Sequence, residues 1–169
     1  KGYEYLINSY VKVKEKHPEW KLSIFGDGEK KYLLKLKKQV SKLDLDNHIF
    51  FEGSTSNLNK ELINSSIFIM TSITECFPMV LLEAMQLGLP PISFDSPNGP
   101  RNIIDHNHNG ILVEYLNTSA LSDSIIFLIE NEDVRKEFGK NAKKKVKNYD
   151  ENIVLKKWIN LFNNSKEVV

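Results

Sequence analysis

The sequence predicts an α/β domain, with a Rossmann-like parallel sheet, helices on both faces and a helical C-terminal tail. Three observations lead to this prediction. Short, continuous apolar segments alternate with segments whose apolar residues recur every three or four positions. The apolar segments lack the polar alternation of a half-exposed sheet, which is typical of strands covered on both faces. Beyond residue 117 the periodicity is helical alone.

Length and composition indicate a single globular domain. The chain has 169 residues, of which 41% are hydrophobic and 27% charged, and its formal net charge is +1. This size allows a substantial core, and the small net charge gives no electrostatic drive toward nucleic acid. No apolar run approaches the roughly 20 residues that span a bilayer. The one cysteine, Cys76, excludes an internal disulfide and suits a reducing compartment, so we expect a cytoplasmic protein.

The apolar periodicity places the elements in order. A first helix has its apolar face at Leu6, Ile7, Tyr10 and Val13 and ends before Pro18. Strands are expected at residues 20–25, 48–51, 67–71, 90–94 and 111–113. Helices are expected between them, around residues 33–43, 57–64 and 78–87.

Three further helices are expected in the tail. Thr118 is of a residue type that caps a helix, and Leu121, Ile125 and Leu128 then point inward. A second helix has apolar residues spaced from 134 to 146, and Asp150 is expected to cap the third.

Ligands of parallel sheets bind beyond the carboxyl ends of the strands, so the loops after residues 25, 51, 71 and 94 are the candidate site. Gly26, Asp27 and Gly28 form one such loop, of the kind that approaches phosphates or bases. Glycine-rich turns between a strand and a helix are also common without a ligand. Both interpretations stay open for this loop.

Two glutamates flank one helix start, in residues 75–83. Pro78 suits the first position of a helix. The free amides of Met79 and Val80 and the positive end of the helix dipole then offer a site for phosphate. Glu83 lies ~7 Å further along the axis, at about 1.5 Å per residue. Glu75 lies ahead of the helix, where it can orient a sugar or oppose developing positive charge.

Glu83 has apolar sequence neighbours, so we expect it to be mostly buried. A buried carboxylate needs a hydrogen-bonding partner, and a pair of vicinal hydroxyls serves. The alternative is that Glu75 and Glu83 are ordinary glutamates on a helix surface.

These residues resemble the signature of the group 1, GT4-like glycosyltransferases of GT-B fold. Glu75 and Glu83 stand with seven residues between them, and Gly88 and Pro90 follow. Residues 20–28, 49–53 and 109–113 also resemble that family's C-terminal domain, in order and spacing. The resemblance covers essentially the whole chain, which is then a single nucleotide-sugar-binding domain over residues 1–169.

The resemblance implies a role for each matching residue. Glu75 and Lys1 take the catalytic positions, Glu75 beside the donor sugar and Lys1 at the diphosphate leaving group. Glu83 binds the ribose. The family usually has glycine where this chain has Cys76. The other implied donor-binding residues are Cys76, Phe77, Pro78, Met79, Val80, Gly26, Asp27, Gly28, Gly53, Ser54, Thr55, Asn98 and Gly99.

Lys1 and Gly2 resemble the end of a longer Gly-Arg…Lys-Gly segment of the family. The resemblance therefore implies that this sequence is a piece of a longer protein. An N-terminal acceptor domain, a partner arginine and the first, central strand of this domain are expected upstream of residue 1.

Three other features have two interpretations each. Arg101 either reaches phosphate or is a surface residue at a helix start, and we favour the surface. His106 and His108 lack a second pair of ligands with suitable spacing, which favours a solvated loop over a metal site. The basic run at residues 143–147 is either a solvated face, which we favour, or a contact with an anionic membrane surface.

The resemblance implies a retaining hexosyltransferase that uses a nucleotide-diphosphosugar and an acceptor hydroxyl, in bacterial surface polysaccharide or glycolipid synthesis. It implies no cofactor and no metal, no nucleic-acid partner, and an acceptor, sugar or lipid-linked, bound mainly by the absent domain. The isolated domain is expected to be inactive. Two alternatives stay open: a non-catalytic nucleotide-sugar-binding or interaction module, and a sugar-nucleotide epimerase or phosphorylase of the same architecture.

Overall fold

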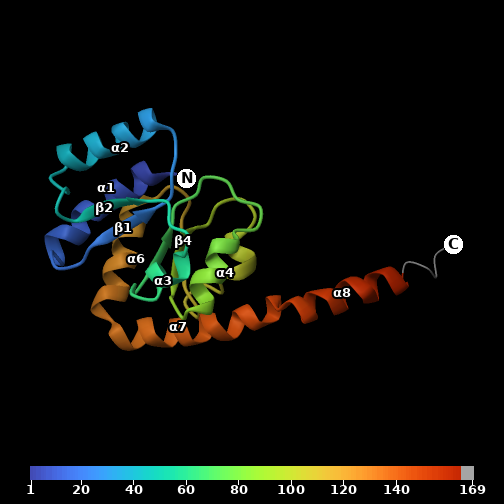
Figure 1. The fold of residues 1–169 in the computed structure, drawn as a ribbon. Coiled ribbons are helices and arrows are strands. Elements are labelled where there is room, and N and C mark those ends of the chain that lie inside the picture. The colour runs from blue at the N-terminus through green and yellow to red at the C-terminus, as the bar shows by residue number, and fades with distance from the viewer. Residues whose placement is uncertain (165–169) are drawn as a thin grey trace.

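The computed structural model describes residues 1–164 and confirms the α/β prediction (Figure 1). Every strand pairing is parallel. The strands are β1 (Leu22–Phe25), β2 (Ile49–Gly53), β3 (Phe68–Met70), β4 (Pro91–Phe94) and β5 (Ile111–Val113). The helices are α1 (Tyr3–Lys16), α2 (Lys30–Lys42), α3 (Leu58–Leu62), α4 (Met79–Gln86), α5 (Pro100–Ile103), α6 (Thr118–Glu130), α7 (Glu132–Val146), the 3-10 helix η1 (Lys147–Tyr149) and α8 (Glu151–Asn164).

The five strands form two sheets, of order β1-β2 and β3-β4-β5. Within the described residues β1 and β3 are not paired with each other, so the predicted parallel sheet is divided in two. In the larger sheet all four residues of β4 are buried, as expected for a central strand covered on both faces. In the smaller sheet only Ile24 and Ile49 are buried.

Helices cover both faces, and an apolar core lies on each side. The larger core joins buried residues of α1, α2 and α6 to β1, β2, β4 and β5. The second core joins α4, α5 and α7 to β3. This arrangement follows from strands that are apolar on both faces and helices that are apolar on one.

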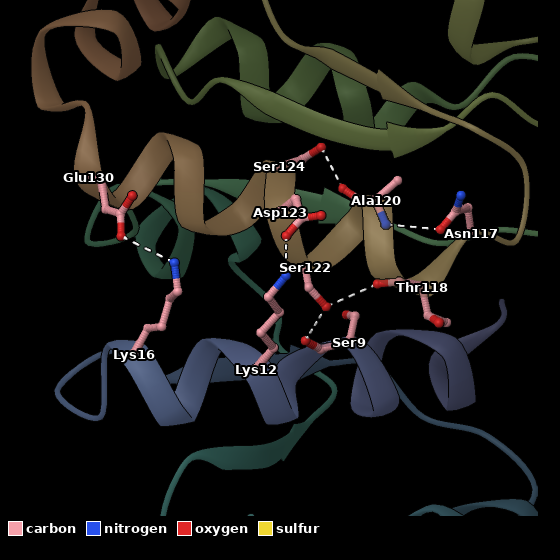
Figure 2. A network of polar contacts seen from close by, with 10 residues as sticks. All are labelled: Ser9, Lys12, Lys16, Asn117, Thr118, Ala120, Ser122, Asp123, Ser124 and Glu130. Atoms are coloured by element: carbon pink, nitrogen blue, oxygen red, sulfur yellow. Dashed lines mark hydrogen bonds and ion pairs between the residues drawn. The ribbon is translucent and has the colours of Figure 1, made fainter.

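Polar contacts tie α1 to α6 (Figure 2). The Ser122 hydroxyl donates to the carbonyl oxygen of Ser9 at 2.7 Å, inside the contact, while Lys12 and Asp123 pair across its exposed rim at 2.5 Å. Helix α1 is thereby fixed against the body of the domain, and α1 carries the chain from Gly2 to the start of β1.

The predicted helix ends differ from the observed ones in small ways. Pro78 is the residue just before α4, so the helix begins at Met79. Asn117, and not Thr118, caps α6, because its side-chain oxygen accepts from the Ala120 amide at 2.9 Å. Asp150 accepts from the Asn152 amide at 3.0 Å, which confirms its predicted position at the start of α8.

The last helix, α8, extends away from the body (Figure 1). All its residues are exposed, including Trp158 at 53%. No helix within residues 1–164 is long and apolar enough to cross a membrane.

Candidate functional site

Four loops follow the carboxyl ends of the strands, as the sequence predicts. They comprise residues 26–28 after β1, 54–57 after β2, 71–78 after β3 and 95–99 after β4. Parallel strands present these ends at one edge of each sheet. Each of the four loops contains at least one residue predicted to bind the donor.

Lys1 and Glu75 meet at this edge. The Lys1 ammonium donates to Glu75 Oε1 at 2.5 Å, and the Glu75 side chain is only 16% exposed. Burial raises the pKa of Glu75, but hydrogen bonds from Lys1 and Ser72 and the charge of Lys1 outweigh it. The pKa of Glu75 therefore lies below its ordinary value, and the carboxylate stays ionised at neutral pH.

Gly2 explains how Lys1 reaches Glu75. Its φ is +70°, in the left-handed region, and a Cβ atom at this position would overlap the carbonyl oxygen of Thr71. The Thr71 hydroxyl in turn donates to the carbonyl oxygen of Lys1 at 3.3 Å. The chain start is thus held against the end of β3, and only glycine permits that approach.

The amino end of α4 lies beside this ion pair. Leu81 donates its amide to the carbonyl oxygen of Pro78 at 3.0 Å, which leaves the amides of Met79 and Val80 without a partner among the described residues. The first turn of α4 contains no acidic side chain. The unpaired amides, the helix dipole and Lys1 together form a positive region at the edge of the sheet.

The loop after β4 packs against the turn that precedes α4. Asn98 and Gly99 are both in the left-handed region, with φ of +63° and +72°. A Cβ atom at Gly99 would lie 3.0 Å from Pro78 Cδ and 3.1 Å from the carbonyl oxygen of Cys76. Ser96, in the same loop, has the one buried side-chain hydroxyl of residues 1–164 that lacks a hydrogen-bond partner. The structure thus places residues 95–99 beside Cys76, Phe77 and Pro78.

The loops after β1 and β2 are joined to each other. The Ser54 hydroxyl donates to Asp27, and the Gly26 amide donates to the carbonyl oxygen of Gly53 at 2.7 Å. Lys1 reaches this region too, because it lines a 440 Å³ cavity together with residues 26–28. Thr55 is turned away toward α3, where its hydroxyl accepts from the Asn57 amide at 3.2 Å.

Asp27 follows β1 but does not cap α2. Asp27 pairs with Ser54, whereas Glu29 occupies the cap position of α2 without a side-chain hydrogen bond.

Glu83 is exposed, so the prediction of a mostly buried carboxylate is wrong. The reason is the rotation of a helix, since α4 buries Leu81, Leu82, Ala84 and Met85 and turns the remaining positions outward. Glu83 lies one turn beyond Met79 on the exposed face. Within residues 1–164 its carboxylate has no hydrogen-bond or ion-pair partner.

Arg101 has the surface position that the sequence favours, and His106, His108 and the basic run lie largely at the surface as well. Arg101 is exposed and pairs with Asp95 through two hydrogen bonds of 2.9 and 2.7 Å. His106 accepts from the Leu112 amide at 3.1 Å. In the basic run, Lys145 pairs with Asp105 at 2.8 Å, while the lysines at 143, 144 and 147 are exposed.

Sequence reasoning missed the residues that hold the Glu75 loop in place. The Tyr115 hydroxyl donates to the carbonyl oxygen of Ile73 at 3.0 Å. On the other side of the turn the Phe77 ring lies 5.6 Å from the ring of Tyr149, between ring centroids. Both tyrosines come from the distant part of the chain, and no local pattern marks them. Ser72 could have been identified from the sequence, because it is a polar residue close to the end of a buried strand.

The fold is that of a GT-B glycosyltransferase domain. The family model described as glycosyl transferases group 1 matches residues 1–145. The chain therefore belongs to the group 1 glycosyltransferases.

Individual relatives agree with this assignment. An uncharacterized glycosyltransferase of Methanocaldococcus jannaschii is 34% identical, over 94% of this chain and 45% of the relative. A poly(ribitol-phosphate) alpha-N-acetylglucosaminyltransferase of Staphylococcus aureus is 32% identical, over 96% of this chain and 33% of the relative. The chain thus spans less than half the length of each of these relatives.

A solved structure is similar over the same region. It is a mutant of TarM from S. aureus in complex with fondaparinux, alpha-GlcNAc-glycerol and UDP, at a TM-score of 0.89 and 32% identity. The match covers 96% of this chain and 33% of that one.

Proposed function

We propose that this chain is the donor-binding domain of a retaining glycosyltransferase, which moves a hexosyl group from a nucleotide-diphosphosugar to an acceptor hydroxyl. One observation carries the proposal: Lys1, Glu75 and the free amides of α4 converge at the carboxyl edge of the sheet. Glycosyl transfer from such a donor needs a positive site for the departing diphosphate and a carboxylate at the sugar. UDP in the complex of the similar TarM structure supports the donor class.

The diphosphate is expected to bind at the amino end of α4. An exposed helix N-terminus stabilises an anion by only about 0.3–1 kcal/mol, less than a factor of ten in affinity. The charge of Lys1 is therefore the larger contribution to binding the leaving group. In this proposal protein groups alone balance the negative charge of the diphosphate, with no metal and no cofactor.

Glu75 is expected to act on the donor sugar. Its low pKa keeps it ionised, so it accepts hydrogen bonds from sugar hydroxyls and opposes positive charge at the anomeric carbon. When the diphosphate arrives, Lys1 turns from Glu75 toward it. The ion pair of the free domain is thus exchanged for two contacts with the donor.

Glu83 is the proposed ribose ligand. Its exposed position one turn along α4 leaves the carboxylate accessible to a nucleotide whose diphosphate lies at Met79 and Val80. The base then lies toward residues 26–28 and 53–55. The backbone of Asn98 and Gly99 borders the sugar and phosphate side of the site.

The whole protein is proposed to act in bacterial surface polysaccharide or glycolipid synthesis. A second, N-terminal domain supplies the acceptor site, and the isolated chain transfers little sugar by itself. We place the protein in the cytoplasm and keep the solvated face as the interpretation of residues 143–147.

Calorimetry with UDP-, GDP- and ADP-sugars tests the donor assignment. We expect one of these classes to bind, and Glu83→Ala to weaken its affinity about ten- to hundredfold, because a hydrogen-bonded carboxylate is removed. Gln86→Ala is the matched control, since it changes the next exposed position of the same helix. If the full-length protein binds no sugar nucleotide, the proposal fails. Equal affinities for the two variants overturn the ribose assignment alone.

Retention is tested separately with the full-length enzyme. NMR of the newly formed linkage is expected to show the anomeric configuration of the donor. An inverted product contradicts the retaining mechanism and leaves the donor site untouched.

A further inference from the structure

Helix α2 carries a high density of positive charge. Its residues 30–42 include six lysines and no acidic residue, although the whole chain has a formal net charge of only +1. The rest of the chain is therefore net acidic. In Figure 1 α2 lies at the outer edge of the domain, well apart from α7. Positive charge is thus concentrated on one exposed element instead of being spread over the surface.

Four of these lysines and one leucine share the outermost face of α2. With 3.6 residues per turn they fall within a sector of roughly 100°, over a length of ~16 Å at about 1.5 Å per residue. The buried Leu36 and Val40 lie on the opposite side of the helix. The exposed residues that form this lysine face are Lys31, Leu34, Lys35, Lys38 and Lys42.

Most of the charge on the lysine face is unpaired. Lys35 donates to Glu4 at 3.0 Å. Lys31, Lys38 and Lys42 have no ion-pair partner within residues 1–164. Glu29, exposed at the start of the helix, borders the face. Even with Glu29 included, the lysine face keeps a net positive charge that is free to attract an anionic partner.

The basic run on α7 differs from the lysine face. Helix α7 has acidic residues in its first turn. Lys136 pairs with Glu132 at 2.6 Å, and Lys145 pairs with Asp105 at 2.8 Å. Charges of mixed sign on a helix are typical of a face that water alone covers. The lysine face of α2 lacks this internal neutralisation.

Leu34 indicates the kind of partner. Its side chain is 60% exposed in the middle of the lysine face, and with Lys31 and Lys38 it lines an open hollow of 620 Å³. A soluble polyanion gains little from an apolar side chain among the ammonium groups. A lipid surface uses both, because anionic headgroups pair with the lysines while the leucine enters the acyl boundary beneath them.

We infer that the lysine face docks the domain on a lipid surface that carries anionic phospholipid. The helix lies flat on this surface, with its ammonium groups at the level of the phosphates and Leu34 directed into the bilayer. Because α2 follows residues 26–28, the docked domain holds this end of its carboxyl edge close to the lipid. The docking is reversible, since a few lysines and one leucine attract far less strongly than an inserted helix.

Co-sedimentation with lipid vesicles tests the inference independently of sugar transfer. The 169-residue chain is mixed with phosphatidylcholine vesicles, or with vesicles of equal parts phosphatidylcholine and phosphatidylglycerol. We expect binding to the anionic vesicles and at least about tenfold weaker binding to the neutral ones. High salt should abolish the difference, because screening shortens the range of the attraction.

Two double variants locate the charge that binds. Lys31→Gln/Lys38→Gln should weaken binding to the anionic vesicles about tenfold or more, since each lysine near such a surface contributes about a factor of five. Glutamine keeps nearly the helix propensity of lysine, so α2 should stay folded. Lys143→Gln/Lys144→Gln makes the same charge change on α7 and is the matched control. It should bind within about twofold of the parent, because α7 lies beyond the range of the surface charge.

A second pair of variants tests the apolar contact. Leu34→Gln should weaken binding to the anionic vesicles about threefold or more, because less apolar surface is buried. Ile63→Gln, at the carboxyl end of α3, is the control, since Ile63 is similarly exposed at 66% but lies outside the lysine face. It should bind like the parent.

Four outcomes overturn the inference. Equal binding by the α2 and α7 double variants means that another surface docks, such as the exposed apolar side chains of α8. Equal binding to neutral and anionic vesicles means that charge does not direct the contact. If Leu34→Gln and Ile63→Gln bind alike, the leucine does not enter the bilayer. If neither vesicle binds, while soluble polyphosphate binds the parent and not Lys31→Gln/Lys38→Gln, the partner is an anionic polymer.

Discussion

The two sheets build two unlike halves of the donor site. Around β3-β4-β5 the central strand is buried and the loops brace one another, with Gly99 against Pro78 and Tyr115 bonded to Ile73. Around β1-β2 residues 26–28 are exposed, and Ser54 bonded to Asp27 is the side-chain link between the two loops. The half proposed for sugar and diphosphate is therefore rigid, whereas the half proposed for the base is open.

Lys1 belongs to both halves. It pairs with Glu75 on the rigid side and lines the cavity of residues 26–28 on the open side. Because only the loops around β3-β4-β5 are braced, we expect substitutions there to lower the free energy of unfolding. Matched substitutions in the exposed loops around β1-β2 should leave it unchanged.

The largest effect is expected for Gly99→Ala. Alanine at this position would be strained, because φ is +72° and its Cβ atom would lie close to the backbone of Cys76. The free energy of unfolding should therefore fall by about 1–3 kcal/mol. Gly28→Ala is the matched change in the open half, where a Cβ atom meets nothing within 4 Å. It should stay within about 0.5 kcal/mol of the parent. Urea denaturation measures both, and equal losses would contradict the comparison.

The next effect is expected for Glu75→Gln, at about 1 kcal/mol at neutral pH, because Lys1 is largely solvated. The folded-state pKa of Glu75 is lowered, so its contribution is present above the unfolded value and is lost as pH falls through the folded value. The variant should therefore lose less stability than the parent between neutral pH and about pH 3. Glu137→Gln, at an exposed position, serves as control. Parallel acid curves for Glu75→Gln and the parent would refute the ion pair.

Tyr115→Phe is expected to cost about 0.5–1.5 kcal/mol, the usual contribution of one hydrogen bond. It removes the bond to Ile73 and keeps the ring. Hydrogen exchange should become faster in residues 72–77 and stay unchanged in residues 26–28. Faster exchange in both loops would mean that the two halves are not separate.

The smallest effect is expected for Ser54→Ala. It removes the hydrogen bond to Asp27 in loops that are already exposed. The free energy of unfolding should therefore change by less than about 0.5 kcal/mol. A loss as large as that of Gly99→Ala, measured calorimetrically, would show that the open half is braced after all.

Sequence periodicity predicted the elements because burial on one or both faces leaves a repeat in the apolar residues. The strand 111–113 was predicted to the residue, and the carboxyl-edge loops were found from strand ends alone. The side of α4 on which Glu83 lies was not predictable from its apolar neighbours. Flanking residues on a helix point in different directions, and only packing decides which face is buried.

Long-range contacts account for the rest. Tyr115 and Tyr149 reach the site from other parts of the chain, and their own sequence surroundings show no sign of it. The apolar periodicity also could not show that the strands divide into two sheets. The residue pattern of a strand reports whether its faces are buried, and it is the same whether or not a neighbouring strand is present. Asn117 and Thr118 are both good capping residues, so composition alone did not decide between them.

The most direct test of the donor site is an amide NMR titration of this chain with UDP. The account predicts that the largest shifts fall on Met79 and Val80, with smaller ones at Gly26, Gly28 and Gly53. Lys1→Ala should weaken the binding, because the main charge opposite the diphosphate is removed. Binding that leaves Met79 and Val80 unshifted, or that is indifferent to Lys1→Ala, would contradict the proposed site.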